Sequence, residues 1–200
     1  MAGDSTNKVQ IQIYNNITKE DFLNNVYPLR VPVVLRGLDI GTCTNTWTVD
    51  YLCQHAGKKE VKIHVCQSAQ MDFLSKNFIY NDFSVFFFLS SKLCLQEEKY
   101  YLRSLGDDPR KDVADIKKQY PSLCNDIILP DLFPQDHFTS SVFRIASKGT
   151  QLWTHYDIMD NFLIQISGLK RAVLFSPRNA TDMYLAGNCG FIYLLLLCAS

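Results

Sequence analysis

The second half of the chain consists of short apolar runs that are separated by turn residues. Glycine or proline interrupts these runs at Gly149, Gly168 and Pro177. Several short strands at such a spacing are typical of a β-sandwich or a β-barrel. We therefore expect strands over residues 141–146, 152–156, 162–167 and 171–176.

The first half mixes short helices with strands. Thr18 and Thr48 are each placed to cap a helix, because a threonine hydroxyl can accept a hydrogen bond from the first helical turn. Asp107-Asp108-Pro109 predicts a further helix that reaches about Tyr120, with proline in its first turn. Strands are expected over residues 31–36, 61–65 and 99–105. The predicted fold class is thus mostly β with N-terminal helices.

Two segments of the first half need separate comment. In the expected strand over residues 61–65, alternation places His64 on the polar face and the apolar residues on the other. Residues 81–96 form a dense apolar run without a clear period. We interpret this run either as a fully buried strand or as a segment that is foreign to its surroundings.

Composition excludes several classes of protein. Apolar residues make up 47% of the 200 residues and the formal net charge is zero, which indicates a globular chain with no global preference for nucleic acid or membranes. The longest apolar runs, Phe83–Leu89 and Phe191–Cys198, are too short to cross a bilayer, so we expect no membrane partner. Seven cysteines without a C-x-x-C pair, and an N-terminus without a hydrophobic signal core, favour a cytoplasmic or nuclear protein that is not secreted.

The motif His155-Tyr156-Asp157 carries the strongest chemical signal. On an extended backbone, residues i and i+2 point to the same face, so an imidazole and a carboxylate would project together. Such a pair supplies two ligands of the 2-His-1-carboxylate iron site, which leaves positions open for a co-substrate and O₂. The bare tripeptide is also common by chance, as a surface histidine beside a loop aspartate.

A lysine follows this motif at a suggestive distance. Lys170 lies 15 residues after His155, at a turn that begins with Gly168. From there its ammonium group could bind the distal carboxylate of a 2-oxo diacid. An ordinary solvated turn lysine is the competing interpretation.

Several segments, taken in order, carry a family resemblance. The run Leu152-Trp-Thr-His-Tyr-Asp157, together with residues 141–145, 161–168 and 170–177, looks like the core of a JmjC/cupin-like dioxygenase. A closer resemblance, to the animal tRNA wybutosine-synthesizing hydroxylases, rests on further segments and covers roughly residues 8–80 and 97–187. These segments are residues 47–52, 57–65, 70–73, 98–106 and 108–116.

The resemblance implies an activity and a set of site residues. The family uses Fe(II), 2-oxoglutarate and O₂ to hydroxylate a wybutosine-type guanosine of phenylalanine tRNA, so the implied partner is tRNA. By motif, His155 and Asp157 match the first two iron ligands. The positions that match 2-oxoglutarate binding are Tyr101, Asn161 and Lys170.

The sequence departs from the family pattern in its last part. The family's third ligand is a histidine on a later strand, whereas the four histidines here are residues 55, 64, 137 and 155. We expect a JmjC/cupin-like domain over residues 1–187, a divergent apolar tail over residues 188–200, and an incomplete double-stranded β-helix (jelly-roll). The family is homodimeric, but its dimerisation helices have no counterpart here. Iron binding and activity are accordingly expected to be impaired.

Basic residues offer a local surface for phosphate. Arg144 and Lys148 are the candidate tRNA contacts, although solvated surface charge is the competing interpretation. Three functions remain open: the tRNA hydroxylase, a JmjC hydroxylase or demethylase that acts on a polypeptide, and a non-catalytic isoform. Further basic residues that could join the surface are Lys58, Lys59, Lys62, Arg110, Lys111, Lys117 and Lys118.

Overall fold

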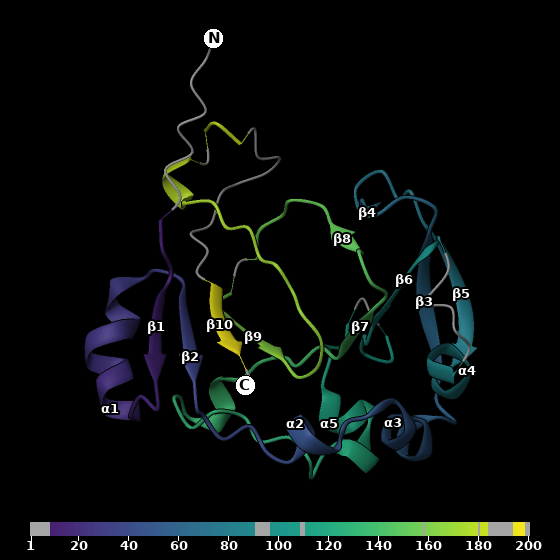
Figure 1. Ribbon diagram of the computed structural model, residues 1–200, viewed down its shortest axis with the longest axis horizontal. Helices are drawn as coiled ribbons and strands as arrows, with labels where there is room; N and C mark the ends of the chain where they lie inside the picture. Colours follow the sequence, from purple (N-terminus) through teal and green to yellow (C-terminus); the bar gives the residue numbers. More distant parts are fainter. Residues whose placement is uncertain are drawn as a thin grey trace. The chain divides into compact units, whose positions relative to one another are not determined.

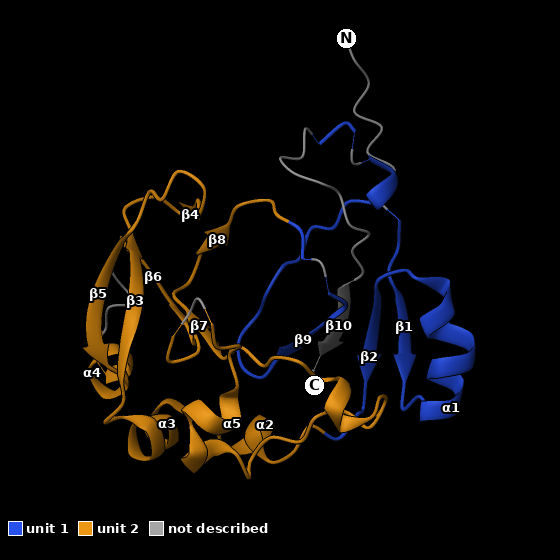
Figure 2. Cartoon of the chain, turned by 180° about the vertical axis from the view of Figure 1, so that it is seen from behind, with its two compact units in different colours: residues 1–39, 156–200 blue, residues 40–155 orange. Residues whose placement is uncertain are grey.

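The chain divides into two compact units, each with its own sheet. The structure is a computed structural model, which describes residues 9–90, 97–108, 111–157, 159–179, 181–183 and 194–198. One unit comprises residues 1–39 and 156–200, and the other comprises residues 40–155 (Figure 2). The chain thus passes from the second unit back into the first between His155 and Tyr156.

The first unit holds a four-stranded sheet with the order β1-β2-β10-β9, in which all neighbours are parallel (Figure 1). Thr18 caps the first helix, since its hydroxyl accepts from the backbone N–H of Asp21, as predicted. Phe22, Val33 and Leu35 are buried and form part of the core. The elements are β1 (Gln12–Asn15), α1 (Lys19–Asp21), η1 (Phe22–Val26), η2 (Tyr27–Leu29), β2 (Val33–Arg36), β9 (Asn161–Gln165), η6 (Pro177–Asn179) and β10 (Leu194–Cys198).

The second unit holds an antiparallel sheet with the order β5-β3-β6-β7 and a parallel pair, β4 with β8. Its helices are α2 (Cys43–Thr46), α3 (Val49–Ala56), α4 (Val85–Ser90), α5 (Ile116–Gln119), η4 (Pro121–Leu123) and η5 (Gln135–His137). Its strands are β3 (Glu60–Cys66), β4 (Gln70–Met71), β5 (Ile79–Ser84), β6 (Lys99–Arg103), β7 (Arg144–Ala146) and β8 (Gln151–Leu152).

The predicted class, mostly β with helices near the N-terminus, is confirmed. Thr48 caps α3 as predicted, by accepting from the backbone N–H of Tyr51. The described strands lie in open sheets and do not close into a barrel. None of the helices in the described part of the chain is long or apolar enough to cross a membrane.

Two of the predicted strands differ in the structure. The strand expected over residues 152–156 ends at Leu152, and residues 171–176 form no strand. Val173 and Phe175 are 61% and 56% exposed, so their run of apolar residues packs against little. A strand exists only where a neighbour completes its hydrogen bonds, and an apolar run cannot supply that neighbour by itself.

Three further expectations need correction. The helix expected up to Tyr120 is limited to α5, which Asp115 caps. Of the apolar run over residues 81–96, residues 91–96 lie outside the described residues; residues 81–90 are the end of β5 followed by α4, and Phe86 and Phe87 are exposed. His64, placed on a polar face by alternation, is only 3% exposed, because aromatic side chains cover that face of the sheet.

Candidate metal site and its surroundings

His155 ends a series of ring contacts in the second unit. It follows β8 in irregular backbone, and its ring stacks on Trp153 with a centroid distance of 4.4 Å. Trp153 stacks in turn on Phe73 at 4.5 Å, and its backbone N–H donates to the carbonyl of Met71. The imidazole is therefore held by the rings of two residues that shortly follow β4 and β8 in the chain.

One hydrogen bond selects the tautomer of His155. Its Nδ1 lies 2.8 Å from the carbonyl oxygen of Trp153. A carbonyl oxygen only accepts, so Nδ1 carries a proton and, in the neutral ring, the lone pair is on Nε2. This is the usual arrangement of a histidine that binds a metal through Nε2.

Asp157 belongs to the first unit and is oriented by the residue that opens β9. The amide Nδ2 of Asn161 donates to Asp157 Oδ2 at 2.6 Å. Oδ1 of the same carboxylate is left for another partner. The neighbouring carboxylate, Asp160, has both oxygens engaged by Arg30 and Tyr27.

The donor atoms of His155 and Asp157 fit a ferrous ion. A neutral imidazole nitrogen and a carboxylate oxygen are two of the three ligands of non-haem iron sites. Across the described ranges, no three His, Cys, Asp or Glu side chains gather closely enough to hold a metal ion. His55, which stacks on Tyr51, and His137, which is exposed in η5, are therefore not part of such a group.

The residues matched to 2-oxoglutarate binding lie in both units. Tyr101 is on β6, is 4% exposed, and contacts the ring of Phe73. Burial raises the pKa of its phenol, so it remains a hydrogen-bond donor. Asn161 and Lys170 are in the first unit, where Asn161 binds Asp157 and Lys170 is exposed after the turn at Gly168.

His64 lies at the centre of the aromatic side chains on this sheet. Its ring contacts four others, and its Nδ1 lies 3.0 Å from the carbonyl of Tyr101. Burial lowers the pKa of His64, so the buried ring is neutral at physiological pH. Its ring packs within the aromatic side chains of this sheet. The four rings around it are those of Phe73, Phe78, Tyr80 and Tyr101.

A row of basic side chains crosses the same sheet. Arg103 on β6 is the register partner of Arg144 on β7. Ile63 pairs with Leu102, so the same register places Lys62 beside Arg103. Neither arginine has an ion-pair partner among the described residues, and Nε of Arg103 is buried without a hydrogen bond.

Like charges directly opposite each other destabilise a strand pair. The row Lys62–Arg103–Arg144 is therefore suited to an anion that would lie across it. Sequence reasoning named Lys62 and Arg144 but missed Arg103. The alternation of Lys99, Tyr101 and Arg103 along one strand was the signal that could have identified it.

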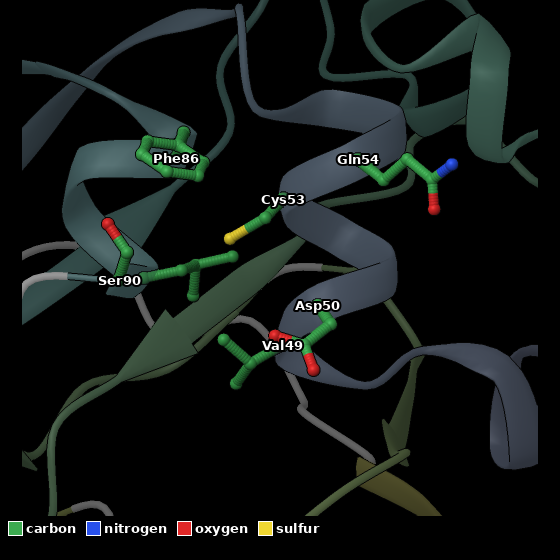
Figure 3. A pocket seen from close by; sticks show the side chains of 7 residues that line it. Val49, Asp50, Cys53, Gln54, Phe86 and Ser90 are labelled. Carbon is green, nitrogen blue, oxygen red and sulfur yellow. The ribbon is translucent and has the colours of Figure 1, made fainter.

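A separate cavity of about 610 Å³ opens between α3 and α4 in the second unit. Figure 3 shows the sulfur of Cys53 between the two helices. Burial raises the pKa of this thiol, which keeps it protonated and a poor nucleophile. None of the predicted site residues lines the cavity, whose lining is Val49, Asp50, Cys53, Gln54, Phe86, Leu89 and Ser90.

Comparison with known proteins gives consistent matches. The chain is 55% identical over 193 residues to tRNA wybutosine-synthesizing protein 5 of Gallus gallus, which covers 90% of this chain and 59% of that protein. The human protein of the same name is 56% identical over 185 residues, with 86% of this chain and 57% of that protein covered. The chain thus spans about three fifths of the length of these curated relatives.

A more distant match covers a much smaller share of the relative's length. tRNA wybutosine-synthesizing protein 4 of Gibberella zeae is 37% identical over 175 residues, which cover 84% of this chain and 17% of that protein. The model of the cupin-like domain family matches residues 19–190, so β10 lies beyond the matched residues. With that match over most of its length, the chain belongs to the cupin-like domain family.

Proposed function

We propose that this chain carries the core of an Fe(II)- and 2-oxoglutarate-dependent hydroxylase that acts on a wybutosine-type guanosine of phenylalanine tRNA. The observation that carries the proposal is that each proposed ligand side chain has one atom held by a hydrogen bond and a second atom left for a metal. The bond to Trp153 occupies Nδ1 of His155 and leaves Nε2 for a metal, and the bond to Asn161 occupies Oδ2 of Asp157 and leaves Oδ1. The substrate is inferred from the relatives, which are named for wybutosine synthesis in tRNA.

The residues have separate roles in this proposal. His155 and Asp157 hold Fe(II), while the Tyr101 phenol and the Lys170 ammonium bind the carboxylates of 2-oxoglutarate. Iron held there would supply the oxidative decarboxylation of 2-oxoglutarate by O₂, which would give succinate and CO₂ and leave one oxygen atom for a substrate C–H bond. The bond from Asn161 to Asp157 supports a ligand-orienting role for Asn161 in addition to the co-substrate contact implied by resemblance.

The row Lys62–Arg103–Arg144 supports RNA as the partner. Two arginines without carboxylate partners on one sheet face can accept a phosphodiester, because guanidinium groups bind phosphate with paired hydrogen bonds. Lys148 is exposed shortly after β7 and can extend the row. Free thiols at the described cysteines Cys43, Cys53, Cys66 and Cys124 fit the cytoplasm or the nucleus.

Metal binding tests the site directly. We expect Co(II), a redox-stable substitute for Fe(II), to bind the 200-residue chain weakly, because only two protein ligands are assigned. His155→Ala and Asp157→Ala should each abolish binding in a spectroscopic titration, whereas His137→Ala at an exposed site should not change it. Binding that survives in both ligand variants would contradict the site.

Turnover tests the reaction. The chain is incubated with Fe(II), 2-oxoglutarate and phenylalanine tRNA, and succinate and the gain of one oxygen by the tRNA are followed by mass spectrometry. We expect slow production of both, lost in His155→Ala. Fast turnover that depends on His155 would overturn the expectation of an impaired site, and tRNA that gains no oxygen while succinate forms would argue against the substrate.

Salt dependence tests the RNA surface. We expect Arg103→Gln with Arg144→Gln to weaken tRNA binding and to reduce the slope of log K against log salt by roughly two, about one for each lost phosphate contact. Arg36→Gln with Arg178→Gln removes the same charge from exposed positions in the other unit and is the matched control. Equal slopes for the two double variants would refute this surface.

A further inference from the structure

Asp160 is bound by two side chains that lie about 130 residues earlier in the sequence. Arg30 donates from Nη1 to Oδ2 at 2.9 Å and from Nη2 to Oδ1 at 2.8 Å. The Tyr27 hydroxyl donates to Oδ2 at 2.9 Å, and the guanidinium of Arg30 also lies 4.8 Å from the centre of the Tyr27 ring. We call these three residues the Asp160 clamp.

The geometry of the clamp is more specific than that of an ordinary surface ion pair. Arg30 and Asp160 form a two-pronged bond, and their side chains are only 34% and 33% exposed. Exposed single ion pairs contribute little, whereas bidentate pairs that are partly shielded from water also fix the orientation of both groups. The clamp therefore specifies where Asp160 lies as well as holding it.

The clamp is attached to the core of the first unit. The ring of Tyr27 lies 6.0 Å from that of Phe22, which is fully buried. Arg30 ends η2 in a left-handed conformation, with φ of 52°. A left-handed residue at a helix end turns the chain sharply. Asp160 is thereby tied to a packed helical segment.

The position of Asp160 in the sequence connects the clamp to the proposed metal site. It lies three residues after Asp157 and directly before Asn161, whose amide binds the Asp157 carboxylate. Asp157 lies in irregular backbone, and Asn161 is the first residue of β9. Neither residue therefore lies inside a strand that would fix the backbone before and after it. Of the three residues between them, the clamp holds the last, Asp160.

We propose that the Asp160 clamp is the positioning device of the proposed metal site, and that Arg30 and Tyr27 set the orientation of the Asp157 carboxylate through Asp160 and Asn161. The inference rests on the proposed metal site. It also assigns different roles to two neighbouring carboxylates, since both oxygens of Asp160 are occupied and Asp157 keeps one oxygen for a metal.

The test compares Co(II) affinity in Arg30→Gln, Asp160→Asn and the double variant. We expect each single variant to bind about tenfold more weakly, because residues that orient metal ligands typically contribute ten- to hundredfold. The double variant should be no weaker than either single one, since both remove the same interaction. Arg30→Lys keeps the charge but loses the two-pronged geometry and should fall in between.

Two further measurements separate positioning from loss of folding. Hydrogen exchange of the metal-free protein should increase at the amides of Asp157, Asp160 and Asn161 in Arg30→Gln, with the core amides of β2 unchanged. Arg36→Gln, an exposed arginine of the same unit, is the control and should change neither measurement. If Arg30→Gln does not fold, Asp160→Asn and Arg30→Lys carry the test.

The outcomes distinguish this inference from the proposed function. If His155→Ala and Asp157→Ala leave Co(II) binding unchanged, the metal site itself is wrong. If both abolish binding while the clamp variants bind as tightly as the wild type, only the clamp inference is overturned. Weakened binding in the clamp variants with intact core amides supports it.

Discussion

At the scale of residues, His64 and His155 belong to one set of aromatic contacts but differ in their surroundings. His64 is 3% exposed and touches four rings, whereas His155 stacks on Trp153 at an exposed position. Burial removes His64 from water and from any metal, and exposure leaves Nε2 of His155 accessible. The motif His155-Tyr156-Asp157 singles out His155 in the sequence, and packing adds that His64 is buried and His155 exposed.

The buried His64 predicts sensitivity to acid. Burial lowers its pKa and the charge of Arg103 lowers it too, although the bond to the Tyr101 carbonyl opposes both. An unfolded histidine has a pKa of about 6.5. As the pH falls below that value, the unfolded chain takes up a proton that folded His64 does not bind, so the free energy of unfolding decreases.

Urea unfolding at about pH 7 and about pH 5 measures this effect. We expect the loss of stability on acidification to be smaller in His64→Gln, which cannot titrate, than in the wild type. His137→Gln replaces an exposed histidine and should lose as much stability as the wild type. The same loss in all three proteins would show that His64 does not contribute.

At the scale of elements, the two helix caps at Thr18 and Thr48 were predicted correctly because they depend on local chemistry, whereas the start predicted at Asp107-Asp108-Pro109 was wrong. The hydroxyls of Thr18 and Thr48 each accept from a backbone N–H three residues later. That bond lies within a few residues, so the sequence contains all of its partners. Strand ends were predicted less well. β8 ends at Leu152, and its neighbour β4 is itself only two residues long.

The cap of α3 gives a prediction for the stability of an element. Thr48→Ala should lower the free energy of unfolding by about 1 kcal/mol, because the first turn loses the acceptor for the N–H of Tyr51. Thr48→Ser keeps a hydroxyl and should retain most of the stability. Chemical denaturation of the three proteins checks this, and equal losses in both variants would exclude capping as the cause.

At the scale of the whole molecule, the chain alternates between two compact units. It leaves the first unit after Asp39 and returns to it at Tyr156. The division falls within the motif His155-Tyr156-Asp157, so each proposed ligand is oriented by contacts from its own unit: Trp153 for His155 and Asn161 for Asp157. Segments from both ends of the chain also share one sheet, since β10 lies between β2 and β9.

The sequence by itself determined the class of fold, the helix caps, the family resemblance and the motif of the proposed ligands. Each of these depends on residue types at short spacings or in a fixed order. Tertiary structure alone decided that Arg103 lies opposite Arg144, that residues 171–176 form no strand, and that Arg30 and Tyr27 hold Asp160. These features depend on partners that are distant in the chain, and a local pattern contains no information about which distant segment will lie beside it.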